Sequence, residues 1–585
     1  MNASQLTLEE KRRHTGSHIL SYAVGMAFKG VKRGVGPHTE DGFYQDFDFG
    51  DQVVSDKDFK AIEKKMRWIV NKDFKVVRVE KSFAQAREYF ANDEYKLELI
   101  DEIEARGETL TFHNFVNEGG EEVYQDLCMG GHLESTGEIG VFKLTKMAGA
   151  YWRGDSDRTM MNRIYGVAFK DEEALKAYQE FLEEAAKRDH RKLGAELDLF
   201  TFSDKVGSGL PLFTPKGAFM RNQIKDTIME IQSQYGFEEV YIPHITKKDL
   251  YVTSGHWDKF KDDLFHVKGK GDTEFVMKPM NCPHHTQIYA SQMRSYRDLP
   301  IRYAETTTCY RDELPGELLG LSRVRALTQD DGHVFCTNDQ VGEEVQNLVK
   351  VVREFYTKLG MWNDDQFWVS LSVRDSANKD KYLGEDKHWD QAEDFLELVA
   401  EGEKLPYKRV EGEAAFYGPK LDFQFKDAIG REWQLATIQL DFVQPERFGL
   451  EYINDQGQKE RPVMIHRAIA GSLERFMSVI IEHFAGAFPA WLAPVQAHIL
   501  PVNQVHEYLA YSLAAQLKDH GGRVEVYDPS DSLGKRIRNS QTKKIPYTIV
   551  IGDNEVNSGK VNVRAYGSDK EETMGLDQFI ELLNG

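Results

Sequence analysis

Cysteine is scarce in this sequence, with four residues among 585. So few thiols in so long a chain exclude a disulfide framework and favour free thiols. Long apolar runs are missing as well, because no segment approaches the roughly eighteen apolar residues that a membrane span needs. The first ten residues contain no apolar core of a secretion signal. These absences predict a cytoplasmic protein that makes no membrane contact.

Positive charge is in deficit, since 74 lysine and arginine residues face 95 aspartate and glutamate residues and leave a net charge of −21. This balance argues against a nucleic-acid binder, because phosphate contacts need lysine and arginine. Two segments are nevertheless locally basic, at residues 187–192 and 535–544. Each is either a solvated helix face or a nucleic-acid contact, and composition alone leaves both alternatives open.

The length predicts several domains, about three to five at roughly 150 residues each. A helix is expected over residues 8–28 and a half-buried strand over residues 42–49, where apolar and polar residues alternate. They belong to a mixed α/β domain that ends near residue 173 and has late strands at residues 141–144 and 164–169.

A charged connecting helix is predicted over residues 171–193, and it should end at Gly194 because glycine often ends helices. Strands and helices then follow irregularly over residues 197–488. Since the βαβα order of a doubly wound sheet is missing, a largely antiparallel sheet is expected there.

Pro489 and Pro494 bracket a hinge. Beyond it a small α/β domain is predicted, because apolar strands at residues 497–501, 523–527 and 547–552 alternate with helical segments. The predicted fold class is therefore a multidomain chain of α/β and α+β parts.

The segment from Thr306 to His333 concentrates chemically active side chains. Arg311 and Glu313 are followed by Arg323 and then by Gln329-Asp330-Asp331-Gly332-His333. Guanidiniums, carboxylates and an imidazole within about thirty residues suit the binding of a polyphosphate and an amino group better than the building of a core.

A second element, Gly471-Ser472-Leu473-Glu474-Arg475, opens a segment with helical periodicity. Its apolar residues recur at intervals of three and four from Leu473 to Phe484, as on the buried face of a helix. Arg475 lies outside this apolar stripe, so its guanidinium is not needed for the core.

These two segments resemble motifs 2 and 3 of class II aminoacyl-tRNA synthetases, and their surroundings resemble the threonyl-tRNA synthetase family. Residues 236–243 resemble motif 1, which class II enzymes use at a dimer interface, so a homodimer is expected. Further signatures of the family recur along nearly the whole chain: His14-Thr15-Gly16-Ser17-His18, Asp126-Leu127-Cys128 with His132, Ala150-Tyr151-Trp152-Arg153-Gly154-Asp155, Met277-Lys278-Pro279-Met280-Asn281-Cys282-Pro283 and Phe416-Tyr417-Gly418-Pro419-Lys420.

The resemblance implies an editing domain at residues 1–173, a linker helix at 174–196, a class II catalytic domain at 197–488 and an anticodon-binding domain at 489–585. The implied activity is that of a threonine–tRNA ligase, which uses ATP with Mg2+, L-threonine and threonine tRNA and hydrolyses mischarged seryl-tRNA. Many family members begin with a small ubiquitin-like module, and the thirteen residues before His14 are too few to supply it.

The same resemblance assigns roles in the catalytic pocket. Arg311 would bridge the carboxylate of the amino acid and the α-phosphate, while Arg475 would lie against the triphosphate, where positioning and charge dominate catalysis. Glu313 would lie near adenine and Arg323 at a further phosphate. The other expected substrate- and ATP-binding residues are Gln329, Asp331, Tyr417, Lys420, Gln434, Gln439 and Ser472, and His256 would approach the terminal ribose.

Cys282, His333 and His466 lie far apart in the sequence, so spacing alone does not nominate them as metal ligands. The resemblance implies that they bind one Zn2+ per chain and leave one position open. Zinc would hold the amino and hydroxyl groups of threonine and so reject valine, which has no hydroxyl. The family usually has glycine after Cys282-Pro283, whereas this chain has His284 and then His285. His284 either competes for the metal or points away from it.

Serine carries the same amino and hydroxyl groups as threonine, and the methyl that it lacks is worth only about 1–3 kcal/mol. A proofreading site is therefore expected. His14 and His18, like Cys128 and His132, are four residues apart, and Asp126 lies close by. Without the family these residues would suggest a zinc hydrolase, or two histidines on a helix surface. The family implies a pocket that hydrolyses mischarged tRNA without a metal.

The anticodon would be read near Lys535, Arg536, Arg538, Glu555 and Arg564, where cations can bind the RNA backbone beside a carboxylate that can accept from a base. Two alternatives remain. One is a paralogue that activates an amino acid for another purpose, and the other is a nucleic-acid-binding protein of class II fold without ligase activity. The intact editing and anticodon modules argue against the first, and the intact Arg311, Arg475 and three zinc positions argue against the second.

Overall fold

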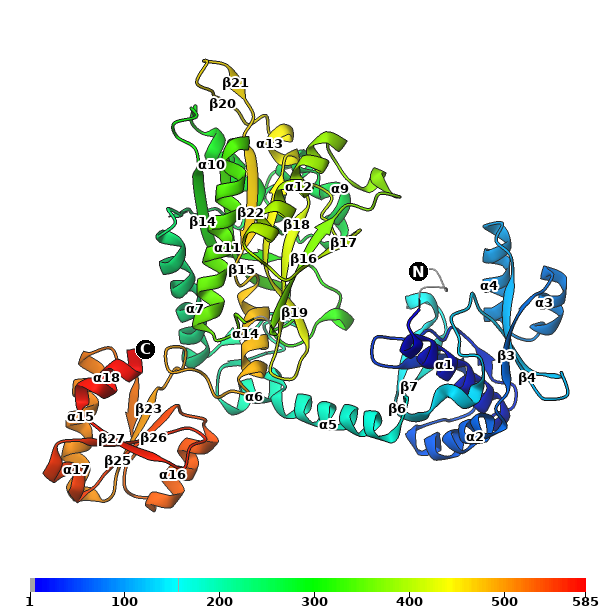
Figure 1. The fold of residues 1–585 in the computed structure, drawn as a ribbon, viewed down its shortest axis with the longest axis horizontal. Helices are drawn as coiled ribbons and strands as arrows, with labels where there is room; N and C mark the ends of the chain where they lie inside the picture. Colours follow the sequence, from blue (N-terminus) through cyan, green and yellow to red (C-terminus); the bar gives the residue numbers. More distant parts are fainter. Residues whose placement is uncertain (1–5, 156, 364, 585) are drawn as a thin grey trace. The chain divides into compact units, whose positions relative to one another are not determined.

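The structure, a computed structural model, describes residues 6–155, 157–363 and 365–584 (Figure 1). Residues 1–5 lie outside the described residues. They are the first half of the ten-residue segment in which the sequence shows no secretion signal. The chain forms two compact units, Met1–Glu183 and Glu184–Gly585. Among the described residues no helix is both long enough and apolar enough to span a bilayer.

The N-terminal unit is built around helix α1 (Leu8–Ala27). Thr7 and Glu10 form a capping box that satisfies the first backbone N–H groups of this helix. Helix α1 packs on α2 (Phe59–Lys72) and on a four-stranded antiparallel sheet in the order β1-β2-β7-β6. The strands are β1 (Lys32–Arg33), β2 (Phe43–Asp48), β6 (Val141–Tyr151) and β7 (Met160–Phe169).

A second, three-stranded antiparallel sheet completes this unit. Its strands are β3 (Lys75–Glu80), β4 (Thr111–Val116) and β5 (Glu122–Leu127), and helices α3 (Phe83–Tyr89) and α4 (Glu94–Ala105) accompany it. Strand β5 carries Asp126 next to its last residue, Leu127, and Cys128 directly follows the strand. The predicted mixture of helices and strands is thus present.

The connecting segment contains two helices, α5 (Glu172–Arg188) and α6 (His190–Glu196). The prediction of a single helix ending at Gly194 is wrong. Asp189 interrupts it, because its carboxylate caps α6 by accepting from the backbone N–H of Arg191 at 2.8 Å. Gly194 lies inside α6, where the ring of Phe200 would lie 2.2 Å from an added Cβ.

The second unit contains an eight-stranded sheet, and all but the two outermost strand pairs are antiparallel, as predicted. In spatial order the strands are β10 (Glu238–Glu239), β14 (Ile301–Tyr310), β15 (Ala326–Cys336), β22 (Val463–Ala468), β19 (Glu432–Asp441), β18 (Lys420–Lys426), β16 (Phe367–Val373) and β17 (Tyr407–Glu411). Helices α11 (Val341–Lys358), α12 (Asp386–Gly402) and α14 (Leu473–His483) pack against it, and α7 (Pro215–Ser233) contacts α11 and α14.

The last part of the chain is a small mixed sheet with helices, which agrees with the predicted α/β domain (Figure 1). Strands β24 (Val524–Val526), β23 (Ala497–Pro501) and β25 (Tyr547–Ile551) are parallel. Strands β26 (Val561–Ala565) and β27 (Glu571–Met574) add to them antiparallel. Helices α15 (Glu507–Asp519), α16 (Leu533–Thr542), α17 (Asp553–Ser558) and α18 (Leu576–Asn584) complete this part.

Candidate functional site

The register of the large sheet places the candidate site residues in one row. His333 on β15 lies opposite His466 on β22, and His466 lies opposite Gln439 on β19. Because directly opposed residues of neighbouring strands share a face, these side chains point the same way. Residues two apart on a strand also share a face, which adds Gln329 and Asp331 of β15 to the group.

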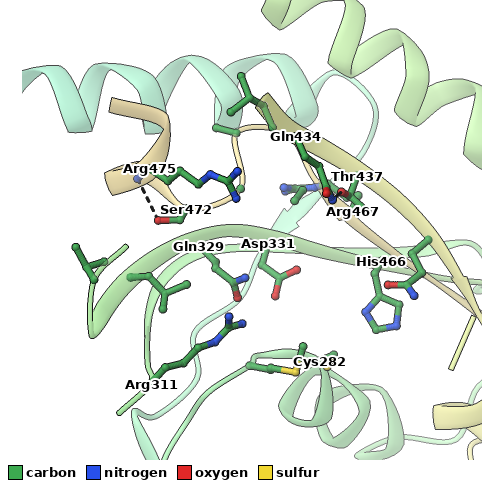
Figure 2. Close-up of a pocket in the computed structure, with 18 of the residues that line it drawn as sticks. Cys282, Arg311, Gln329, Asp331, Gln434, Thr437, His466, Arg467, Ser472 and Arg475 are labelled. Atoms are coloured by element: carbon green, nitrogen blue, oxygen red, sulfur yellow. Dashed lines mark hydrogen bonds between the residues drawn. The ribbon is translucent and has the colours of Figure 1, made fainter. Parts of the chain in front are cut away.

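This face of the sheet forms the floor of a cavity of about 560 Å³ (Figure 2). Thirteen of the fifteen predicted catalytic, substrate and metal residues line it, and only His256 and Lys420 do not. The thirteen are Cys282, Arg311, Glu313, Arg323, Gln329, Asp331, His333, Tyr417, Gln434, Gln439, His466, Ser472 and Arg475.

The two others lie close by. His256 is 1% exposed and pairs through Nδ1 with the Ser254 hydroxyl at 2.8 Å, and its ring centroid lies 6.0 Å from that of Tyr417. Lys420 donates to Asp422 at 2.6 Å, and Asp422 also accepts from the Gln434 amide at 2.8 Å.

The two motif arginines enter the cavity from different elements. Arg311 follows β14, whereas Arg475 lies in the first turn of α14, which Ser472 caps by accepting from the Arg475 N–H at 3.3 Å. Figure 2 shows both guanidiniums directed into the pocket. Burial lowers the pKa of Arg475, but a guanidinium ordinarily titrates so far above neutrality that the side chain stays charged at neutral pH. The pocket therefore holds two cations that can meet phosphate oxygens.

Glu313 and Arg323 form an ion pair at the cavity wall, with 2.6 Å between Oε2 and Nη2. Arg323 also lies 3.2 Å from Glu317. The guanidinium is half exposed, so this pair is screened by solvent and can exchange partners when an anion arrives.

The predicted metal ligands come together. One donor atom from each of Cys282, His333 and His466 lies within 4.8 Å of the others, and all three residues are buried. His333 Nε2 lies 3.0 Å from His466 Nδ1. Cys282 is the first residue of α10 (Cys282–Ala290).

The outer ring nitrogens of these two histidines are also engaged. His466 Nε2 lies 2.8 Å from a carboxylate oxygen of Asp441, and His333 Nδ1 lies 2.7 Å from His285 Nδ1. Since a carboxylate can only accept, the proton of neutral His466 lies on Nε2 and its Nδ1 offers a lone pair to the cavity. A carboxylate behind a metal-binding histidine is a common arrangement. The donor set thus fits a transition metal ion.

Protonation in this region follows from burial. Burial lowers the pKa of His333 well below its ordinary value and raises the pKa of the Cys282 thiol well above its own. It also raises the pKa of Asp331. Asp331 accepts from the Asn281 amide at 3.0 Å, which fixes it beside the ligands. His284 is buried too, and burial lowers its pKa to about 4.

Sequence reasoning missed several residues of this site. Asp441 and His285 contact the metal-ligand candidates, while Thr437, Ser322 and Arg467 line the cavity. Asp441 had no motif around it, and only the strand register brings it next to His466. His285 was noted in the sequence solely as a neighbour of His284.

The N-terminal unit brings its own predicted cluster together. Cys128 Sγ lies 3.1 Å from His132 Nε2 and 3.5 Å from His14 Nε2, and the rings of His14 and His18 are 5.3 Å apart. A cavity of about 410 Å³ is lined by His14, His18, Asp126 and Cys128, among others. The four candidate donors also lie within 4.8 Å of one another, so geometry alone would permit a metal here.

Burial dominates the protonation of this cluster. It lowers the pKa of His14 to about 4 and those of His18 and His132 well below their ordinary value. It raises the pKa of the Cys128 thiol to about 12. At neutral pH the cluster therefore consists of neutral imidazoles and a protonated thiol.

Lys96 and His113 were not foreseen as members of this site. Lys96 lies 2.6 Å from Asp126, and both side chains are almost fully buried. Burial alone would raise the pKa of Asp126, but the charge of Lys96 beside it holds that pKa below its usual range. His113 lies against Cys128 O at 3.2 Å, with its ring 4.8 Å from that of His132. Neither residue belongs to a sequence motif, because Lys96 is an isolated residue of α4 and His113 an isolated residue of β4.

The predicted anticodon residues differ in exposure. Lys535 and Arg538 are exposed on α16. Arg536 is 1% exposed and donates to the carbonyls of Asp531 and Pro501, so its guanidinium is used inside the fold. Glu555 accepts from the Gly552 N–H at 2.8 Å, and Arg564 pairs with Asp569 at 2.8 Å. The prediction for Arg536 gains no support from this arrangement.

Comparison with known families matches three segments of the chain. Residues 265–484 match the tRNA synthetase class II core domain of the G, H, P, S and T enzymes, and residues 496–585 match an anticodon binding domain. Residues 115–165 match the second additional domain of threonyl and alanyl tRNA synthetases.

Individual relatives agree with these matches. A threonine–tRNA ligase of Staphylococcus aureus is 47% identical over 98% of this chain and 87% of its own length. The solved RNA binding domain of a threonyl-tRNA synthetase from Cryptosporidium parvum is 38% identical, with a TM-score of 0.64 over 68% of this chain and 98% of that one. A threonyl-tRNA synthetase from Aeropyrum pernix is 30% identical, with a TM-score of 0.61 over 68% and 94%.

The antiparallel sheet, its arginine-lined cavity and the matched core together define a class II aminoacyl-tRNA synthetase. Enzymes of this class use ATP with Mg2+. By its identity to full-length relatives, the chain belongs to the threonine–tRNA ligase family. The resemblance predicted from the motifs is confirmed, and the N-terminal match is to a domain associated with editing.

A buried ion pair between Arg467 and Asp330 supports the cavity. We expect the free energy of unfolding of this unit to depend strongly on it. Arg467→Met leaves the Asp330 carboxylate buried without its cation and should lower the free energy of unfolding of this unit by about 3–5 kcal/mol. The control Arg353→Met, which removes a partly exposed pair with Glu403, should cost below ~1 kcal/mol. Urea unfolding followed by tryptophan fluorescence measures both, and equal losses would contradict the expectation.

Proposed function

We propose that this chain activates threonine as an adenylate in the cavity of the large sheet and transfers it to threonine tRNA. The observation that carries the proposal is that Arg311, Arg475 and the Cys282–His333–His466 donor set line one cavity. No specific observation favours the alternatives, a nucleic-acid-binding protein without ligase activity or a paralogue that makes another product.

In this proposal the two arginines provide the main electrostatic contribution. Arg311 holds the threonine carboxylate against the α-phosphate, and Arg475 lies along the triphosphate from the start of α14. Both are positioned before substrate arrives, so little reorganisation is needed as charge develops on the phosphate. Glu313 lies at the part of the cavity wall that meets adenine, and Arg323 at the part that meets a further phosphate.

Threonine would be selected at the other end of the cavity. Cys282, His333 and His466 would hold Zn2+, which supplies a Lewis-acid position for the amino and hydroxyl groups of threonine when bound. Asp331, fixed by Asn281, would accept a hydrogen bond from the substrate. Gln329, Tyr417, Gln434 and Gln439 would complete the walls, and valine would leave this polar pocket unsatisfied.

Several further predictions remain proposals. Exposed Tyr241, within the motif 1 segment, is consistent with a homodimer interface. Lys535 and Arg538, which face solvent, are the better supported candidates for RNA contacts. The domain limits at residues 173, 196 and 488 and a cytoplasmic location stay predictions.

Arg311→Ala should reduce threonine-dependent ATP–pyrophosphate exchange by at least about 100-fold, because the variant loses the cation that joins carboxylate and phosphate. The control Arg461→Ala removes an arginine near the surface that lies outside the cavity lining and should leave the rate unchanged. The assay includes a panel of amino acids. Near-normal exchange by Arg311→Ala, or a preference for an amino acid other than threonine, would contradict the proposal.

Cys282→Ala should remove zinc from the protein and abolish threonine activation. The control Cys336→Ala, which removes a buried thiol at the end of β15, should retain both. Because the buried thiol must lose its proton to bind a cation, zinc affinity should rise with pH. Metal analysis after dialysis measures occupancy. Full occupancy with unchanged activation in Cys282→Ala would refute the assignment.

We also propose that the N-terminal cluster hydrolyses seryl-tRNA. Neutral His14, His18 and His132 can position water by accepting hydrogen bonds from it, whereas a thiol with a pKa of about 12 is a poor nucleophile. Direct attack by water is therefore favoured over a covalent route through Cys128. Asp126, tied to Lys96, would hold the polar wall of this pocket in place.

The double variant His14→Ala/His18→Ala should charge threonine normally but accumulate seryl-tRNA, because the editing pocket loses its water-positioning groups. Arg67→Ala, on the exposed side of α2, serves as the control and should edit normally. Deacylation of supplied seryl-tRNA on threonine tRNA is the measurement. Failure of the unmodified protein to deacylate it would exclude a working editing site.

A further inference from the structure

A buried histidine joins the linker to two elements of the active site. His190, the first residue of α6, is 3% exposed. Its Nδ1 lies 2.6 Å from a carboxylate oxygen of Glu482 on α14, and its Nε2 lies 3.1 Å from the backbone nitrogen of Leu321. The function described above assigns it no role.

The tautomer of this histidine follows from its partners. A backbone N–H can only donate, so Nε2 of His190 must accept from Leu321. The proton then lies on Nδ1 and is donated to Glu482, which also accepts from the His190 backbone N–H at 3.0 Å. Both ring nitrogens are engaged, so the grouping of His190 with Asp189 and Glu482 does not call for a metal ion.

Leu321 belongs to a tight turn that leads into the ATP side of the cavity. Leu319 and Arg323 close this turn by mutual backbone hydrogen bonds of 3.1 and 3.3 Å. Gly320 has a φ of +50°, and His190 Nε2 would lie only 2.2 Å from a Cβ at that position. The turn and the imidazole are therefore in close contact. Arg323 lies two residues after Leu321, whose N–H donates to His190.

A second linker residue reaches the other arginine-bearing element. Arg188, at the end of α5, donates to the carbonyls of Glu482 and His483 at 3.2 and 2.9 Å, in the last turn of α14. The first turn of the same helix carries Arg475. The linker thus contacts both the turn before Arg323 and the helix of Arg475.

We propose that His190 is a positioning residue for ATP binding: its Nε2 fixes the turn at Leu321 and so places Arg323 at the cavity wall. The proposal rests on the assignment of Arg323 to a phosphate. Without this acceptor the Leu321 N–H is buried and unpaired, which favours another conformation of the turn. The linker, as well as the cavity itself, then determines how firmly ATP is held.

Two substitutions separate the two hydrogen bonds of the imidazole. In His190→Asn the side-chain amide can still donate to Glu482 from the place of Nδ1 but cannot reach Leu321. In His190→Gln the amide oxygen can occupy the place of Nε2 and accept from Leu321. ATP–pyrophosphate exchange should show KM for ATP raised about 10-fold in His190→Asn, with KM for threonine unchanged, and largely restored in His190→Gln.

Hydrogen exchange at residues 319–323 gives an independent measurement, and protection should fall in His190→Asn and return in His190→Gln. Gly320→Ala should resemble His190→Asn, since its Cβ would displace the imidazole. Equal effects of Asn and Gln, or an unchanged KM for ATP with full protection in His190→Asn, would overturn the proposal. If Arg323→Ala leaves KM for ATP unchanged, the phosphate assignment fails; if it raises that KM and His190→Asn does not, only the role of His190 fails.

Discussion

The buried ion pair between Arg467 and Asp330 is the contact on which the geometry of the catalytic cavity depends. One oxygen of Asp330 pairs with Arg467, while the other accepts from the backbone N–H groups of Ile469 and Ala470 at 2.8 and 3.0 Å. These bonds fix the turn that leads into α14 and so place Arg475. Because Arg467 follows His466 directly on β22, the same pair also fixes the strand that carries a predicted metal ligand.

The elements that sequence predicted well are those whose signals are local. Helix α1 was predicted from its residue pattern, and the antiparallel sheet from the missing βαβα order. Arg311, Arg475 and the three metal-ligand candidates were found through motifs, each of which occupies a few consecutive residues. Such signals do not depend on how distant segments pair.

The residues that escaped prediction depend on pairing between distant segments. Asp441 reaches His466 only because β19 pairs with β22 in one register, and Lys96 reaches Asp126 from a helix that has no motif. The break at Asp189 is a competition between helix continuation and a side-chain cap, which periodicity cannot resolve. His113 was a single histidine in a strand, a pattern that has no specific chemical meaning by itself.

The six-residue strand β22 constrains how this sequence can change. His466 and Arg467 point to opposite faces, one toward a donor set and one toward an ion pair. Exchange of one apolar residue for another in this strand would be tolerated far more readily than a change in its length. An insertion or deletion of one residue would turn each of these side chains to the opposite face of the sheet. The protein would then lose both the donor set that selects the substrate and the ion pair that stabilises the fold. Length variation among relatives should therefore gather in loops and avoid this strand.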